Sequence, residues 1–311
     1  MRKKLFVLVV LALVMGSIAP MAVSAQEPYT ISLLTGTMDN PYWITVTENA
    51  QKAAEMLGVN LVPLAVDVEG IATQQISQME DRIAQGDDAI VVAVQETQAL
   101  IPAIEQANAA GIPVIAIDKG AEGGKMESII MTDNVAAAYD GAKWVAEQIG
   151  GKGKVLLLEG RPGGQTAIDR KTGGEKAFAE YPDIEVISLP GDWETAKAQA
   201  MTEDVLTANP DLAGIFASND MMAIGAVTAL AAAGLDIPVC GFDAVDPALV
   251  MVRDGRLGAT VAQFPGRMGF MGVEYAVRVI NGEAVPEMVN SGSMLVTRDN
   301  VLTFQAGLFG R

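Results

Sequence analysis

Planar polar and aromatic side chains recur just after short apolar runs of the sequence. Asn40, Tyr42 and Trp43 follow the first such run of the globular region, and Asp118 and Lys119 follow the fourth. In open α/β sheets, ligands bind beyond the carboxyl ends of the strands. If the apolar runs are parallel strands, the side chains that follow them are expected to share one site.

The second half of the chain repeats this arrangement, with further planar and aromatic residues placed after apolar runs or just before predicted helices. Such planar groups carry paired donors or acceptors that bond adjacent hydroxyls, and aromatic faces pack against the C–H faces of a sugar ring. The pattern therefore predicts a cleft for a polyhydroxylated ligand. The candidate ligand-binding residues are Asn40, Tyr42, Trp43, Asp118, Lys119, Arg170, Trp193, Asn219, Asp243 and Gln263.

Each candidate also has a purely structural interpretation. Asn40 precedes Pro41 and could serve only as the N-cap of a helix, and an Asp that follows a strand often caps a helix or closes a turn. Tyr42, Trp43 and Trp193 could serve only to pack one part of the fold against another. The binding hypothesis depends on the whole set, because capping alone does not explain so many planar groups in equivalent positions.

The residue types restrict the chemistry that this site can perform. The chain has no histidine, which removes Ser–His and Cys–His nucleophile pairs and imidazole zinc ligands. The single Cys240 lies in an apolar run and is expected to be buried, with no intrachain disulfide. We expect no enzymatic activity, no cofactor and no metal. The enzymatic alternative is a glycosidase that uses Asp118 and Asp243 as an acid/base pair.

The charge balance limits the partners. With 38 Asp and Glu against 21 Lys and Arg, the formal net charge is −17. Such a chain repels nucleic acid and lacks the basic stripe that a nucleic-acid reader needs. The acidic surface also discourages self-association, so we expect a monomer.

The first 25 residues have the features of a cleavable secretion signal. Arg2, Lys3 and Lys4 precede an apolar stretch that is too short to span a bilayer, and small residues end at Ala25. We therefore expect cleavage after Ala25 and a periplasmic protein. The remaining length of about 285 residues is more than one core usually supports, which indicates two domains.

Short apolar runs alternate with stretches of helical period, which is typical of parallel βαβ units. Asn40 and Pro41 are expected to open a helix that Gly58 closes, Asn134 to cap a helix over 135–149, and Pro265 to open one over 266–280. The predicted strands are 31–35, 61–66, 89–94, 114–117, 128–131, 155–158, 184–189, 214–217, 239–242 and 259–262.

Six segments taken in order resemble a known family. They are DNPYW at 39–43, IPVIAID at 112–118, TDN at 132–134, ASNDMMAIG at 217–225, VCGFD at 239–243 and ATVAQFP at 259–265. Over nearly the full mature length, the chain is similar to the ribose/allose-type periplasmic sugar-binding proteins of ABC importers. Repressor cores share this fold, but they carry an N-terminal DNA-binding domain and are not exported.

The resemblance implies an α/β fold of two Rossmann-like lobes, each a parallel sheet flanked by helices, joined by three crossing hinge segments. The expected lobes are 26–131 plus 264–292 and 132–263 plus 293–311, after the signal peptide 1–25. Hinges are expected near 132–133, 263–264 and 291–293. The resemblance assigns Asn40, Tyr42, Trp43, Asp118 and Lys119 to the N-terminal side of the site and the other five candidates to the C-terminal side and its hinge.

The chain departs from the ribose-type pattern at several site positions. Lys119 replaces an Arg, Gly36 stands where a small hydroxyl residue is usual, and tryptophans replace phenylalanines at two stacking positions. Lysine lacks the planar fork of arginine, so the hydrogen-bonding pattern toward the ligand changes. The resemblance thus predicts a monosaccharide (a ribose-like pentose or a hexose) or a related polyol, without fixing which one.

Two binding functions fit these residues. In the leading hypothesis the protein captures a monosaccharide between its lobes and delivers it to an ABC transporter permease. In the alternative it is a sugar or polyol sensor that presents its closed form to a chemoreceptor or kinase. The sequence does not separate the two, because both use the closed, ligand-bound state.

Overall fold

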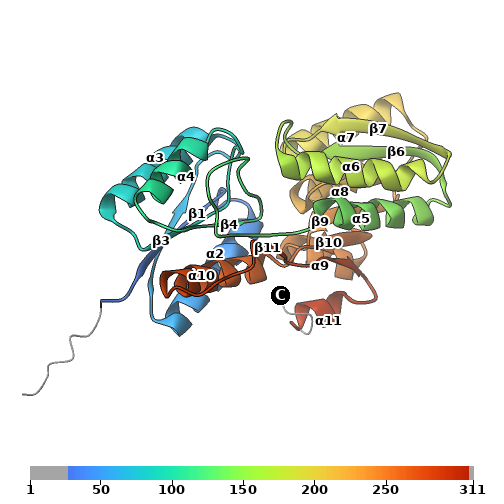
Figure 1. Ribbon diagram of the computed structural model, residues 1–311. Helices are drawn as coiled ribbons and strands as arrows, with labels where there is room; N and C mark the ends of the chain where they lie inside the picture. Colours follow the sequence, from blue (N-terminus) through green and yellow to red (C-terminus); the bar gives the residue numbers. More distant parts are fainter. Residues whose placement is uncertain (1–26, 308–311) are drawn as a thin grey trace, which may run out of the picture.

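The computed structural model describes residues 27–307, which form two α/β lobes side by side (Figure 1). The predicted signal peptide, 1–25, lies outside the described residues. Within residues 27–307, no helix combines the length and apolar character needed to cross a bilayer.

The first lobe is built on a six-stranded parallel sheet in the order β11-β5-β4-β3-β1-β2. Helices α2 (Pro41–Leu57) and α10 (Pro265–Ile280) cover one face, and α3 (Ala72–Gln85) and α4 (Ile101–Ala109) cover the other. Leu33 packs with Val46 of α2 while Leu34 packs with Met79 of α3, because successive strand residues point to opposite faces. The strands are β1 (Thr30–Thr35), β2 (Asn60–Ala65), β3 (Ala89–Val92), β4 (Val114–Ile117), β5 (Ser128–Met131) and β11 (Met288–Asn290).

The second lobe repeats this design with the sheet order β12-β10-β9-β8-β6-β7, in which only the edge strand β12 is antiparallel. Helices α5 (Asn134–Gln148) and α6 (Gln165–Ala179) pack together on one face. The other helices are α7 (Thr195–Ala208), α8 (Asp220–Ala233), α9 (Asp246–Asp254) and α11 (Val301–Gln305). The strands are β6 (Lys152–Glu159), β7 (Asp183–Pro190), β8 (Leu212–Ala217), β9 (Val239–Asp243), β10 (Ala259–Ala262) and β12 (Met294–Thr297).

Three segments cross between the lobes, after β5, after β10 and between β11 and β12. Their side chains meet where they cross. The Thr132 hydroxyl donates to Gln263 Oε1 at 3.3 Å and lies 3.0 Å from the Ser291 hydroxyl, which in turn donates to the Gln263 carbonyl at 3.2 Å. All three residues are buried. The crossing segments are thus tied to one another by buried hydrogen bonds.

All ten predicted strands are present, with ends that shift by up to three residues. The sequence analysis missed β11 and β12, which have only three and four residues, and β11 is mostly exposed. Runs this short do not stand out as strands in the sequence. Two helix boundaries are confirmed. The Asn40 side chain accepts from the Tyr42 amide at 3.0 Å, and Gly58 closes α2 in the left-handed conformation that glycine favours.

The assignment of Asn134 as an N-cap is wrong. Asp133 caps α5 by accepting from the Ala136 amide at 3.0 Å, and Asn134 is the first residue of the helix. The Asn134 side chain instead bonds to Arg170 and to the Thr132 carbonyl, because it faces the buried interior rather than the helix end.

Candidate functional site

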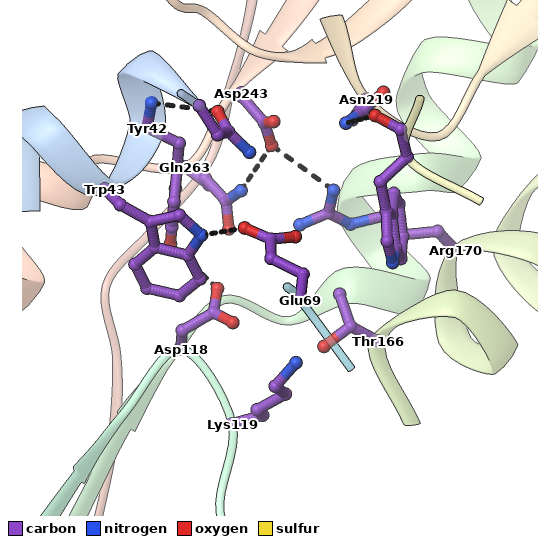
Figure 2. Close-up of a pocket in the computed structure, with 12 residues that line it drawn as sticks. Tyr42, Trp43, Glu69, Asp118, Lys119, Thr166, Arg170, Asn219, Asp243 and Gln263 are labelled. Atoms are coloured by element: carbon purple, nitrogen blue, oxygen red, sulfur yellow. Dashed lines mark hydrogen bonds and ion pairs between the residues drawn. The ribbon is translucent and has the colours of Figure 1, made fainter. Parts of the chain in front are cut away.

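All ten residues predicted from the sequence line a single cavity of about 390 Å³ between the lobes, and Glu69 and Thr166 complete its wall (Figure 2). The cavity sits beyond the carboxyl ends of strands from both sheets, as the fold dictates.

On the second lobe, Arg170 is the centre of a buried network. Its Nε donates to Asn134 Oδ1 at 2.9 Å, and its Nη1 donates to the Ser218 carbonyl at 2.7 Å and to Asp243 Oδ1 at 3.2 Å. The guanidinium carbon lies 3.8 Å from the centre of the Phe242 ring. Stacking and three hydrogen bonds therefore hold this buried cation in one orientation.

Asp243 is the carboxylate partner of this network. Its Oδ1 also accepts from Gln263 Nε2 at 2.5 Å, so the residue contacts both Arg170 and a crossing segment. Burial raises the pKa of Asp243 to about 7, although the charge of Arg170 opposes the shift. Behind it, Asp220 accepts from Thr260 Oγ1 at 2.7 Å, and burial raises its pKa well above the usual value.

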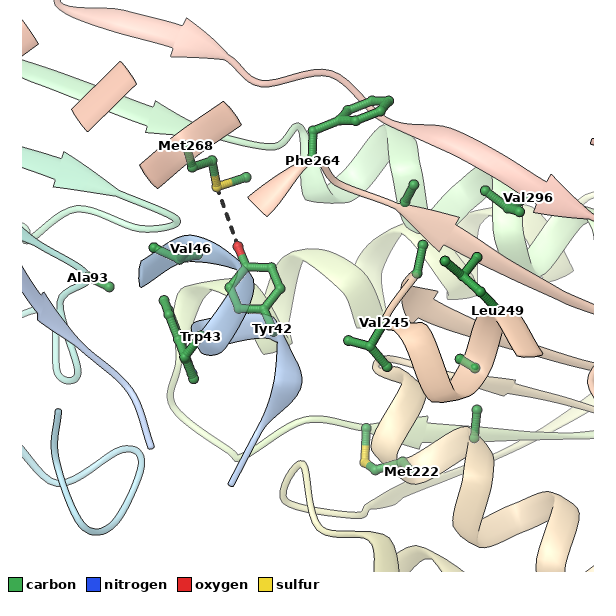
Figure 3. Close-up of a cluster of buried hydrophobic side chains, with 14 of the residues drawn as sticks. Tyr42, Trp43, Val46, Ala93, Met222, Val245, Leu249, Phe264, Met268 and Val296 are labelled. Atoms are coloured by element: carbon green, nitrogen blue, oxygen red, sulfur yellow. Dashed lines mark hydrogen bonds between the residues drawn. The ribbon is translucent and has the colours of Figure 1, made fainter. Parts of the chain in front are cut away.

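On the first lobe, Asp118 has fewer partners. Its Oδ1 accepts from the Tyr42 hydroxyl at 2.8 Å. Tyr42 is buried, and burial together with the Asp118 charge raises its pKa well above 10.0. The Tyr42 hydroxyl also lies 3.4 Å from the sulfur of Met268 on α10, and Trp43 packs edge-on against the Tyr42 ring (Figure 3). The aromatic pair is thus part of the lobe core and of the cavity wall.

Lys119 and Glu69 form the other part of this wall. The Trp43 indole N–H donates to Glu69 Oε1. Burial raises the pKa of Glu69, and the positive charge of Lys119 opposes that shift. Among residues 27–307, the Lys119 ammonium forms no hydrogen bond or ion pair.

Two glycines make room for the tryptophans. A Cβ on Gly36 would lie 2.1 Å from the Trp43 indole nitrogen, and a Cβ on Gly160 would lie 1.9 Å from the Trp193 ring. Any side chain at either position would displace an indole. Gly36 therefore explains the missing hydroxyl residue of the first loop: the space that such a side chain needs is occupied by the Trp43 ring.

Three site residues hold backbone conformations that side chains disfavour. Asp118, Trp193 and Asp243 have φ angles of 65°, 70° and 117°. Each such residue costs on the order of 1–3 kcal/mol, and such conformations cluster at ligand sites. The surrounding sheet ends hold these side chains toward the cavity.

The structural and binding interpretations coexist at two positions. Asn40 caps α2, and Asn219 caps α8 by accepting from the Met222 amide at 2.8 Å, yet both line the cavity. The Asn219 amide group also donates to the Trp193 carbonyl at 3.4 Å. These two side chains therefore fix the helix ends that border the site.

Sequence reasoning missed Glu69 and Thr166. Glu69 lies four residues beyond the end of β2, in a loop whose length hides its position. Thr166 is the second residue of α6, after a glycine-rich loop. The general signal was available for both, because Glu69 lies in the loop between a strand and the following helix and Thr166 lies in the first turn of a helix that follows a strand. Within 27–307, no cluster of three or more acidic or Cys side chains could hold a metal ion.

Comparison with known proteins agrees with this architecture. The profile of the periplasmic binding protein domain matches residues 31–284. The chain is 35% identical to the ribose import binding protein RbsB of Escherichia coli K12 over 268 residues, which cover 86% of this chain and 90% of that protein.

Two solved structures are also similar. A periplasmic solute-binding protein of an ABC transporter from Actinobacillus succinogenes, with bound D-allose, has a TM-score of 0.85 and 36% identity, covering 88% of this chain and 99% of the other. A carbohydrate transporter solute-binding protein from Agrobacterium radiobacter, in complex with D-arabinose, has a TM-score of 0.85 and 31% identity, covering 91% and 99%.

Proposed function

The chain belongs to the periplasmic binding protein family, and we propose that it captures a monosaccharide between its lobes and delivers it to the permease of an ABC importer. One observation carries the proposal. Planar polar groups and aromatic rings from both lobes line one cavity between the lobes. The names of its relatives, which include ribose import proteins and proteins holding D-allose or D-arabinose, support the same ligand class.

The ten residues predicted from the sequence are the proposed ligand-binding set. Asp118 and Asp243 each keep one carboxylate oxygen without a hydrogen bond to another described residue, so each can accept from a sugar hydroxyl. Trp43 and Trp193 lie on different lobes. A ring held between the lobes would contact both tryptophans, and its hydroxyls would bond to both sets of polar groups.

Ligand contact with both lobes favours the closed form. A ligand that binds one conformation better shifts the population toward it. We propose that lobes 26–131 plus 264–292 and 132–263 plus 293–311 move as bodies about the three crossing segments. The buried contacts among Thr132, Gln263 and Ser291 support a hinge at this place.

The cellular role extends the same proposal. The N-terminal sequence supports secretion to the periplasm with cleavage after Ala25. A monomer would present both lobes to the permease. Because the proposed site groups act as hydrogen-bond partners, we propose no enzymatic role, and the protein needs no cofactor to bind its ligand.

A thermal-shift screen of the purified protein tests the proposal. The panel holds pentoses, hexoses, polyols and amino acids. We expect saturable stabilisation by one or a few monosaccharides, because a ligand that binds only the folded state raises the melting temperature. Stabilisation by amino acids alone, or release of product from aryl glycosides, would overturn it. Stimulation of ATP hydrolysis by the partner transporter distinguishes import from a sensory role.

A further inference from the structure

The wall of the cavity holds a buried hydroxyl that has no partner. Thr166 is 6% exposed, and its Oγ1 forms no hydrogen bond to any described residue. Buried polar atoms in folded proteins are nearly always hydrogen-bonded, so an orphan at a cavity wall is available to a partner from outside the chain, either water or a ligand. Its position on α6 directs the hydroxyl into the cleft rather than along the helix (Figure 2).

A charged group from the first lobe faces this hydroxyl. In Figure 2, the amino group of Lys119 and the hydroxyl of Thr166 point toward one another, and the Glu69 carboxylate lies above them, where it accepts from the Trp43 indole. Lys119 and Glu69 come from the first lobe and Thr166 from the second. We call these three residues the outer subsite.

The outer subsite lies at an exit from the cavity. Its three residues line the inner cavity and also a groove of about 1110 Å³ that runs between the lobes. Tyr42 and Trp43 line the inner cavity but not the groove. A ring held against Tyr42 and Trp43 would therefore direct a substituent, rather than the ring itself, toward the outer subsite, and Trp193, which lines both spaces, would border both.

The charges of the outer subsite select a neutral group. The opposite charges of Glu69 and Lys119 offset one another, so neither an anionic nor a cationic ligand group gains a net attraction. A neutral hydroxyl can accept from the Lys119 ammonium, donate to the Glu69 carboxylate and do either with Thr166. The subsite therefore favours a hydroxyl over a charged group.

We propose that the outer subsite recognises the exocyclic hydroxymethyl group of a hexopyranose, so that the protein prefers a hexose to the pentose of the same ring configuration. This inference rests on the proposed function, because it names the sugar class for the same site. Glu69, Lys119 and Thr166 are then residues that determine specificity. The ring itself contacts the inner cavity and is common to both sugars of a pair.

Matched sugar pairs test the inference by isothermal titration calorimetry. D-Allose and D-ribose, D-glucose and D-xylose, and D-galactose and L-arabinose each differ in pyranose form only by the hydroxymethyl group. For the pair that binds best, we expect the hexose to bind at least tenfold more tightly. Thr166→Val should reduce that preference at least threefold while pentose affinity changes less than twofold. Glu69→Gln should reduce the preference at least threefold as well, whatever it does through Trp43 to the affinity for both sugars.

Thr97→Val is the matched control. Thr97 lines the groove but not the inner cavity, and its hydroxyl already donates to Glu122 at 3.2 Å. This variant should keep the wild-type preference. Equal binding of both sugars by the wild type, or an equal loss for both in Thr166→Val, would overturn the inference and leave monosaccharide capture standing. If no sugar of any pair binds, the proposed function itself fails.

Discussion

The two walls of the cleft differ in how completely their polar groups are partnered. On the second lobe, Arg170 bonds to Asn134, Ser218 and Asp243, and Asp243 also bonds to Gln263. On the first lobe, Asp118 accepts one side-chain hydrogen bond, from Tyr42, and the Lys119 ammonium donates none to the described residues. The polar groups of the second lobe are thus hydrogen-bonded to one another without a ligand, whereas those of the first lobe keep bonding capacity for one.

This difference suggests a division of labour. Groups already fixed in a network lose little freedom on binding, so the second lobe provides a rigid anchor. Groups with free bonding capacity respond to the hydroxyl pattern that they meet, so the first lobe determines which sugar is accepted. If this is correct, substitutions on the second lobe should damage folding and affinity together, whereas those on the first lobe should act mainly on affinity.

The largest effect is expected for Arg170→Met. Removing one member of a buried ion pair leaves the Asp243 carboxylate uncompensated, which typically costs about 3–5 kcal/mol. We expect a loss of this size in the free energy of unfolding, measured by urea denaturation, and at least a hundredfold loss of sugar affinity, measured by calorimetry. Lys171→Met is the control, since Lys171 is partly exposed and its pair with Glu159 should contribute at most about 1 kcal/mol. Wild-type stability in Arg170→Met would contradict the anchor role.

A smaller and more selective effect is expected for Asp118→Ala. A hydrogen bond to a charged group contributes about 1.5–3 kcal/mol, which corresponds to a loss of affinity of at least tenfold. Stability should fall by less than in Arg170→Met, because only Tyr42 loses a partner. Asp88→Ala serves as the control: its carboxylate bonds to the Thr30 amide, away from the cavity, so sugar affinity should stay unchanged. Equal losses of stability in the two site variants would remove the distinction between the walls.

The sequence predicted the site residues of the second lobe (the anchor wall) except Thr166, and those of the first lobe (the selective wall) except Glu69, for the same physical reason. Parallel strands bring their carboxyl ends to one edge, so the residues after them could be assigned to one site without knowing any distance. The partners of Arg170 could not be predicted, because the roles of Asn134 and Ser218 depend on how α5 and α6 pack. Glu69 was missed because its loop folds back over Trp43, a long-range contact that local sequence does not encode.

Adding a methyl group at Gly36 tests whether Trp43, on the wall formed by the first lobe, contacts the sugar. In Gly36→Ala, the added Cβ would overlap the Trp43 indole, which must move and weaken its bond to Glu69. We expect a loss of affinity of roughly three- to tenfold with a stability change below about 1.5 kcal/mol. In Gly164→Ala, the new methyl would lie 3.6 Å from the nearest carbonyl oxygen, an ordinary contact, so calorimetry should give near wild-type affinity. Unchanged affinity in Gly36→Ala would mean that Trp43 does not touch the sugar.

A separate effect, on the stability of the second wall, concerns pH. Because the folded pKa of Asp243 is about 7 and the ordinary value is 3.8, the native state holds this proton more tightly than the unfolded chain. Stability from this group is therefore present at low pH and is lost as pH rises through about 4 to about 7. The shift sets an upper limit of about 4 kcal/mol. Burial is its main cause, the charges of Asp118 and Glu69 add to it, and the charge of Arg170 and the hydrogen bond from Gln263 oppose it.

Denaturation of the wild type and of Asp243→Asn across this range isolates the contribution. The difference in unfolding free energy, wild type minus variant, should decrease as pH rises. A difference that stays constant, or that increases with pH, would show that Asp243 is ionised throughout and that the anchor wall is less buried than the structure indicates.

Tryptophan fluorescence tests the central claim most directly, because a tryptophan lies on each wall and the third lies elsewhere. Trp43 and Trp193 line the cavity, whereas Trp144 packs against the core of the second lobe. Titration with the sugar that the thermal-shift screen selects should change the emission saturably in the wild type and in Trp144→Phe. The change should shrink in both Trp43→Phe and Trp193→Phe. A change that survives in both cavity variants and disappears in Trp144→Phe would show that the sugar does not bind between these two walls.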